Sequence, residues 1–142
     1  MTGLVATAET DVHATPEQVW AALTNPGVIA KYMFGTRVET DWQPGSPITW
    51  AGEYQGKQYQ DHGKVLEVDP NRLLRVSHFS PLTGQPDTPE NYHEVTYRLT
   101  GDGGHTHVTL SQDNNSSPDE AEHSRANWDM MLQGLKKAVE EG

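Results

Sequence analysis

The sequence contains no cysteine, which excludes disulfide bonds, thiolate metal sites and a cysteine nucleophile. Long hydrophobic runs are also missing, since no stretch approaches the roughly 20 apolar residues of a membrane-spanning helix. The first residues, Met1–Leu4, form neither a basic nor an apolar segment, which predicts that there is no signal peptide. A reducing, cytoplasmic location fits these absences.

Basic residues are scarce. The chain has 10 Lys and Arg against 20 Asp and Glu, for a net charge of −10. The basic residues are scattered, and only Lys136 and Lys137 are adjacent. Binding of a phosphate backbone or an anionic membrane surface needs clustered basic residues, so neither partner is expected. The negative charge favours solubility.

Apolar residues are few: they make up 34% of the chain, and the mean hydropathy is −0.73. Four Trp and five Tyr partly compensate, because each aromatic side chain buries a large area and keeps a polar group. A length of 142 residues matches one ordinary domain. The sequence therefore predicts a single domain over residues 1–142.

Two short helices are predicted near the start of the chain. Thr15 is a suitable N-cap, Pro16 suits the first helical position, and Gln18 can complete a capping box. Asn25 before a proline repeats this start signal, which predicts a second helix ending near Gly35.

The C-terminal segment predicts a long helix of about 24 residues. Ser117, Pro118 and Glu120 repeat the capping pattern. One apolar face recurs at helical spacing, formed by Trp128, Met131, Leu132, Leu135 and Val139.

Between these helices, and before them, the pattern is that of short strands separated by tight turns. This spacing indicates an antiparallel meander rather than β-α-β units. The segment 80–91 contains three prolines and is predicted to be the longest irregular stretch. The predicted strands cover residues 4–12, 38–42, 48–54, 58–68, 73–79, 92–100 and 105–112.

The order of strand, two short helices, further strands and long helix describes an α+β helix-grip fold, with a curved antiparallel sheet of six to seven strands around the last helix. The chain resembles the START/Bet v 1-like (SRPBCC) superfamily, and within it the branch named for the activator of Hsp90 ATPase homologue 1. The residues that carry the resemblance are 19–24, 63–70, 72–73 and 127–136.

The resemblance implies a hydrophobic cavity between the sheet and the C-terminal helix. It favours a small-molecule binding protein for an apolar, lipid-like or aromatic, polyketide-like ligand, acting as a monomer or homodimer. An enzyme of cyclase, aromatase or hydrolase type in the same cavity is the alternative. A third reading is an Hsp90 co-chaperone-like interaction protein.

Several aromatic and polar-tipped side chains are predicted to line this cavity. Trp128 and Met131 belong to the apolar face of the long helix, and core packing explains the same pattern. Tyr32 and Phe34 are placed either at the cavity mouth or in the packing of the second helix. The predicted ligand-binding residues are Tyr32, Trp50, His78, His93, Tyr97, Trp128 and Met131.

No catalytic set or metal-binding motif accompanies these residues. His105 and His107 are two apart on one strand, and they follow a Gly-rich turn, so an exposed hairpin is the plainer account. The sequence has no Gly-x-Ser-x-Gly elbow. His78, His93 or Glu53 would be available for general acid–base chemistry. We therefore expect no metal, no cofactor and no catalytic residues.

Overall fold

The computed structural model describes residues 3–33, 35–54, 56–81 and 84–141. Within them, seven strands form one antiparallel sheet in the order β1-β7-β6-β5-β4-β3-β2. The strands are β1 (Leu4–Val12), β2 (Arg37–Glu39), β3 (Pro47–Tyr54), β4 (Lys57–Asp69), β5 (Leu73–His78), β6 (His93–Asp102) and β7 (His105–Asn115). The helices are α1 (Pro16–Thr24), α2 (Pro26–Tyr32), the 3-10 turn η2 (Pro89–Asn91) and α3 (Pro118–Glu141).

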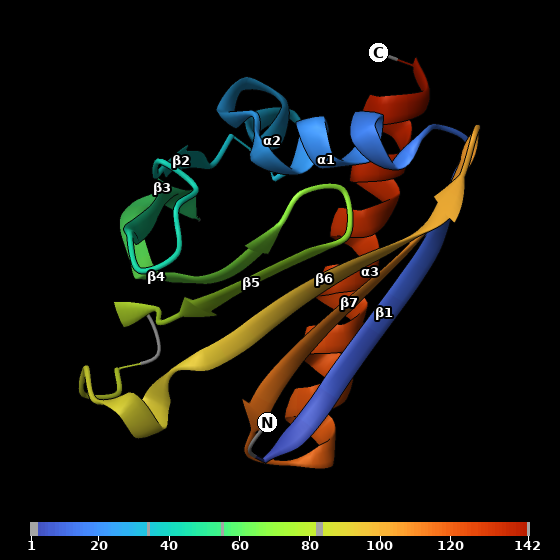
Figure 1. Ribbon diagram of the computed structural model, residues 1–142. Helices are drawn as coiled ribbons and strands as arrows, with labels where there is room; N and C mark the ends of the chain where they lie inside the picture. The colour runs from blue at the N-terminus through green and yellow to red at the C-terminus, as the bar shows by residue number, and fades with distance from the viewer. Residues whose placement is uncertain (1–2, 34, 55, 82–83, 142) are drawn as a thin grey trace.

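The long helix α3 lies along one face of the sheet, as Figure 1 shows, with α1 and α2 at one end. It packs mainly against β1 and also touches β7, α1 and α2. Its fully buried Leu132 and Leu135 join one core with the inward side chains of the strands, such as Val65 and Val108. The predicted helix-grip fold is confirmed.

The predicted starts of the first and last helices are confirmed. At α1, Thr15 accepts from the backbone N–H of Gln18, and the Gln18 side chain accepts from the Thr15 N–H in return. At α3, the Ser117 hydroxyl accepts from the Glu120 N–H over 3.1 Å. The Glu120 carboxylate binds the N–H and hydroxyl of Ser116 rather than the N–H of Ser117, so this capping box is shifted by one residue.

Several predicted strand ends were wrong by one to three residues. β2 stops at Glu39, where its pairing with β3 ends, instead of continuing to Trp42, whose φ of 61° departs from the extended backbone of a strand. β7 continues past Gln112 to Asn115, whose side-chain amide donates to the Leu4 carbonyl of β1. The hairpin between β6 and β7 is also tighter than predicted, because Asp102 already pairs with His105.

The proline-rich segment 80–91 is attached to β4 by a polar cluster. The Tyr92 hydroxyl donates to Asp87 over 2.6 Å, and His62 Nε2 lies 2.8 Å from the same carboxylate. The Tyr92 hydrogen bond holds the pKa of Asp87 below its ordinary value, and partial burial raises the pKa of Tyr92 to about 12. The ring of Tyr92 also stacks on the ring of Phe79, with the two ring centroids 5.3 Å apart.

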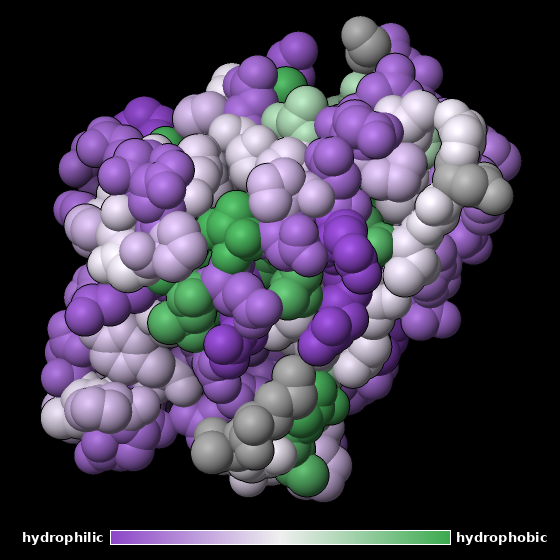
Figure 2. All heavy atoms as spheres, in the orientation of Figure 1, coloured by the Kyte–Doolittle hydropathy of each residue, from purple (hydrophilic) through white to green (hydrophobic). Residues whose placement is uncertain are grey.

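The face shown in Figure 2 is mostly hydrophilic, and hydrophobic residues reach it only in small groups. Among the residues that the structure describes, the exposed large hydrophobic ones are Leu4, Val5 and Met130. None of the helices in the described residues is both long and apolar enough to cross a membrane.

Candidate functional site

A recess opens between the sheet and α3 and narrows toward the core. Its outer space has a volume of about 310 Å³, at the lower end of the roughly 300–1,000 Å³ typical of ligand pockets. Segments far apart in the sequence form it, from the end of α2 to the middle of α3. Its lining residues are Met33, Thr36, Glu53, Tyr59, Gln112, Ser124, Asn127, Trp128 and Met131.

Two smaller spaces continue the recess inward. The next has a volume of about 60 Å³ and shares Met33, Thr36, Tyr59 and Trp128 with the outer space. The innermost has a volume of about 20 Å³ and lies in the core. The middle space is lined by Met33, Thr36, Trp50, Tyr59, Asp61, Val76, His78, Val95, Tyr97 and Trp128.

Strand register explains why these side chains meet. Trp50 of β3 pairs with Asp61 of β4, and directly paired residues in an antiparallel sheet project to the same face. On the neighbouring strands, His78 lies two residues after Val76, so both face the same side. Tyr97 of β6 is two residues from Val95, the partner of Val76. The concave face therefore gathers Trp50, Asp61, His78 and Tyr97 beneath α3.

Asp61 and His78 form the one ion pair that the structure records in the recess. His78 Nε2 lies 2.9 Å from Asp61 Oδ2, and the exposed fractions of the two side chains are 23% and 14%. The Trp50 ring packs edge-on against the His78 imidazole with centroids 4.9 Å apart. The second carboxylate oxygen, Asp61 Oδ1, is buried without a hydrogen-bond partner in the described part of the chain. An acceptor buried in this way favours a ligand that donates a hydrogen bond.

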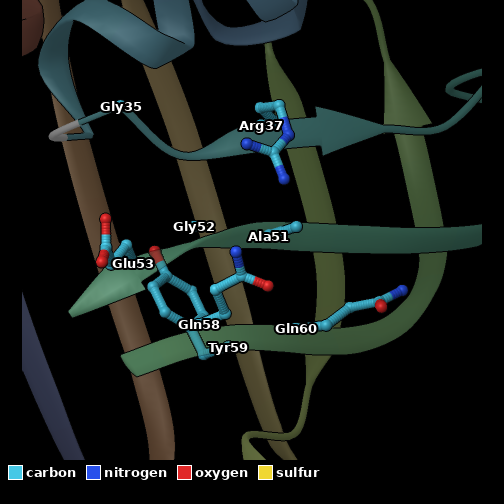
Figure 3. A pocket seen from close by; sticks show the side chains of 8 residues that line it. All are labelled: Gly35, Arg37, Ala51, Gly52, Glu53, Gln58, Tyr59 and Gln60. Atoms are coloured by element: carbon cyan, nitrogen blue, oxygen red, sulfur yellow. The ribbon is translucent and has the colours of Figure 1, made fainter. Parts of the chain in front are cut away.

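Tyr59 stands at the junction of the outer and middle spaces. Thr36 Oγ1 donates its proton to the Met33 carbonyl, so the Tyr59 hydroxyl donates to Thr36 Oγ1 over 2.8 Å. The Tyr59 ring lies against Gly52 on β3, where a Cβ would come within 2.8 Å of the Tyr59 hydroxyl oxygen. Gly52 therefore leaves room for the ring, as the close-up in Figure 3 shows.

The wall from α3 is provided by Trp128 and Met131. The Trp128 indole N–H donates to the side-chain oxygen of Gln112 on β7, which fixes the orientation of the ring. Met131 is buried one turn further along and lines the outer space. Both predicted residues thus lie in the recess.

Tyr32 and His93, two other predicted residues, have different surroundings. Tyr32 is buried, donates its hydroxyl to the Ala22 carbonyl over 3.0 Å, and lines only the innermost space. His93 is absent from all three linings, and its Nδ1 lies 2.8 Å from the Asp113 carbonyl oxygen. Phe34 lies outside the described residues. Burial raises the pKa values of Tyr32 and Tyr97, so both phenols stay protonated.

The sequence prediction missed several lining residues of the recess, including Tyr59 and Asp61 of β4. The sequence signal for Tyr59 and Asp61 was the alternation of side chains along β4, which places both on the same face of the sheet as Val65. Using it required the register between β3 and β4, because only the pairing of Asp61 with Trp50 shows which face looks toward α3.

A second, larger pocket of about 620 Å³ lies at the β2–β3–β4 end of the sheet (Figure 3). Apart from Tyr59, which it shares with the recess, its polar side chains are exposed: Arg37, Glu53, Gln58 and Gln60. A ligand bound by exposed, flexible side chains stays largely in contact with water, and ordering these side chains lowers the affinity. We therefore take the recess under α3, with its partly buried rings, as the candidate site.

The histidines at the β1–β7 edge form a separate, exposed cluster. His107 Nδ1 lies 2.8 Å from Asp11 Oδ1, and His105 Nε2 lies 3.3 Å from the same oxygen. Within the ranges that the structure describes, no group of three or more His, Asp or Glu side chains could hold a metal ion. The hydrogen bond to Asp11 raises the pKa of His107, and the same bond lowers the pKa of Asp11.

These shifts predict a pH-dependent contribution to stability. The stabilisation that protonated His107 contributes is fully present below its ordinary pKa of 6.5. It is lost as the pH rises through the raised pKa of His107 in the folded protein. The stabilisation that ionised Asp11 contributes is present above its ordinary pKa of 3.8. It is lost as the pH falls through the lowered pKa of Asp11 in the folded protein. We expect His107→Asn to lower Tm by at most about 3 °C at pH 5.5, with a smaller deficit at pH 8.5.

Thermal melts of both proteins at the two pH values measure this difference. His123→Asn is the matched control, because His123 is an exposed histidine of α3 for which the described residues give no ion pair. A His107→Asn deficit that grows between pH 5.5 and 8.5 would contradict the assigned pair.

Comparison with known proteins gives the chain a family. A family model described as "Activator of Hsp90 ATPase homolog 1-like protein" matches residues 13–140. The solved structure of ChR145 from Cytophaga hutchinsonii is 50% identical to this chain, covers 99% of it and 97% of its own length, and has a TM-score of 0.86. A search of curated proteins found no match.

More distant structures share the fold. The Aha1 dimer from Colwellia psychrerythraea is 22% identical, with 96% of each chain covered and a TM-score of 0.75. DynU16, from the dynemicin biosynthetic locus, is 19% identical, with 96% of this chain and 47% of DynU16 covered and a TM-score of 0.78.

Proposed function

Because the chain belongs to the family of activator of Hsp90 ATPase homolog 1-like proteins, whose fold is of a ligand-binding type, we propose that it binds a small, mostly apolar molecule in the recess under α3. The observation that carries this proposal is the set of partly buried aromatic rings from β3, β4, β6 and α3 around one space: Trp50, Tyr59, Tyr97 and Trp128. Aromatic walls with a few polar groups are typical of sites that bind and orient such molecules.

The setting of this function follows from the same features. We propose one domain over residues 1–142 that works in the cytoplasm, supported by the absence of cysteine. Its assembly is a monomer or a homodimer, and the Aha1 structure from Colwellia is a dimer within the same fold. The proposed ligand-binding residues are Trp50, Tyr59, Asp61, His78, Tyr97, Trp128 and Met131.

Native mass spectrometry of the purified protein, followed by organic extraction, tests the proposal. We expect a co-purifying apolar compound at near one per chain. The second measurement is a titration with N-phenyl-1-naphthylamine, a neutral fluorescent probe. The fluorescence of this probe increases when it moves from water into an apolar site. A protein that carries no compound and does not enhance the probe would contradict the proposal.

Trp128→Leu is expected to weaken probe binding about three- to tenfold, because an aromatic contact is worth roughly 0.5–1.5 kcal/mol beyond its area. Leucine preserves an apolar wall but removes the ring that the outer and middle spaces share. The measurement is the dissociation constant from the fluorescence titration.

The matched control is Trp20→Leu. Trp20 is a partly buried tryptophan of α1 that packs against the core and lies outside the recess linings. It is expected to leave probe affinity within about twofold. Equal losses in the two variants would indicate a general loss of structure and would remove Trp128 from the site.

A second candidate function is acid–base catalysis, which the Asp61–His78 pair favours. A carboxylate that accepts from an imidazole fixes the orientation of the ring, and an oriented imidazole in a recess can transfer protons to or from a bound molecule. Mass spectrometry of the extracted compound after incubation with fresh protein tests this. Conversion by the wild type that His78→Gln abolishes would support an enzyme.

A further inference from the structure

The recess carries the negative charge of carboxylate side chains. Among the described residues, no Lys or Arg lines any of its three spaces. Asp61 stands in the middle space and Glu53 at the outer one. The imidazole of His78 already faces Asp61 Oδ2. The chain as a whole has a net charge of −10, which raises the local concentration of cations near such a site.

The Asp61 carboxylate can accept one more hydrogen bond. Its Oδ2 takes the His78 Nε2–H, while Oδ1 is buried and has no partner in the described part of the chain. Burying a carboxylate is unfavourable unless its charge is compensated and its oxygens accept hydrogen bonds. A positively charged N–H donor compensates the charge and fills the open acceptor at once, whereas a hydroxyl only fills the acceptor.

The surrounding rings favour the same chemistry. Trp50, Tyr59, Tyr97 and Trp128 line the same small space as Asp61. The faces of aromatic rings attract cations, and tryptophan does so most strongly. The space of about 60 Å³ suits a head group only, so the body of a ligand must lie in the outer space of about 310 Å³, against Trp128 and Met131.

We propose that the recess binds a protonated organic amine with an apolar body, whose ammonium N–H donates to Asp61 Oδ1 between the aromatic rings. This inference deepens the proposed function and rests on it. It names the ligand class: a primary or secondary amine attached to a hydrocarbon or aromatic group, in preference to the corresponding alcohol or carboxylate.

The test compares three probes of nearly equal shape at pH 7: 2-phenylethylamine, 2-phenylethanol and phenylacetate. Binding to the wild-type protein is measured by calorimetry and by displacement of N-phenyl-1-naphthylamine. The amine is expected to bind at least about tenfold more tightly than the alcohol, and the carboxylate least tightly. An alcohol that binds as tightly as the amine would overturn the proposal, as would a carboxylate that binds more tightly.

Asp61→Asn is the matching variant, because it keeps the shape of the side chain and removes its charge. It is expected to weaken amine binding at least about tenfold. Asp69→Asn, at the exposed end of the same strand, makes the same charge change outside the recess and is the control. Amine affinity that stays the same in Asp61→Asn would overturn the proposal.

Failure of the two proposals can be told apart. If the protein carries no co-purifying compound and the neutral probe does not bind, the proposed function fails, and the amine assignment, which rests on it, fails with it. If the neutral probe binds but the amine has no advantage, the binding function stands and the amine assignment is wrong. Circular dichroism melts establish that Asp61→Asn is folded, and the wild-type series decides the question without any variant.

Discussion

Replacing Gly63 with alanine is expected to destabilise the protein by about 3 kcal/mol or more, which for a chain of this size lowers Tm by roughly 10 °C. A Cβ at Gly63 would lie 1.8 Å from the carbonyl oxygen of Ser77 and 3.1 Å from the backbone nitrogen of His78. These atoms belong to the neighbouring chain segment, not to the end of a flexible side chain. The methyl group therefore fits only if β4 and β5 move apart.

Thermal and urea denaturation of Gly63→Ala against the wild type measure this effect. The matched control is Gly103→Ala, because a Cβ at Gly103 meets nothing within 4 Å. The control is expected to change stability by at most about 0.5 kcal/mol. Similar melting temperatures for the two variants would show that β4 and β5 do not approach as closely as described.

The same close approach bears on the recess. Asp61 lies two residues before Gly63, and His78 follows the Ser77 carbonyl that the glycine accommodates. The approach of the two backbones brings Asp61 Oδ2 to 2.9 Å from His78 Nε2. We therefore expect the folded fraction of Gly63→Ala to bind amines less tightly, because separation of β4 and β5 disturbs this pair. The glycine that permits the close approach of β4 and β5 therefore also permits the polar pair of the site.

Helix starts were the features that the sequence predicted best, because a cap is a local signal. Thr15, Gln18 and Ser117 act through backbone groups three residues away at most, so a short window of sequence contains the whole interaction. Strand ends depend on distant partners. β7 extends to Asn115 because the N-terminal strand supplies the Leu4 carbonyl, more than a hundred residues away.

The candidate site was predictable only in part, for the same reason. Trp128 and Met131 could be predicted from helical spacing alone, and both line the recess. His93 shares its alternation with Tyr97, yet it sits at the start of β6, beyond the recess linings. Alternation predicts which face a side chain takes, but not how far along the strand the cavity extends. That distance depends on where α3 crosses the sheet.

Leu132→Ala is expected to cost about 2–5 kcal/mol, which corresponds to a decrease in Tm of roughly 6–15 °C. Leu132 is 0% exposed and belongs to the hydrophobic core, and truncation leaves a cavity that rigid neighbours fill only partly. Denaturation by urea and heat measures the loss. Met130→Ala is the control on the same helix, because Met130 is 57% exposed, and its change should stay within about 0.5 kcal/mol.

Leu132→Ala also separates the anchoring of α3 from its role as a cavity wall. Leu132 lies outside the recess linings, whereas its neighbour Met131 lines the outer space. At a temperature well below its Tm, Leu132→Ala should therefore bind the neutral probe within about twofold of the wild type, although it is far less stable. Trp128→Leu should show the opposite pattern, with the larger effect on binding. A Leu132→Ala protein that loses probe binding while still folded would mean that the anchoring and ligand-binding faces of α3 are not separate.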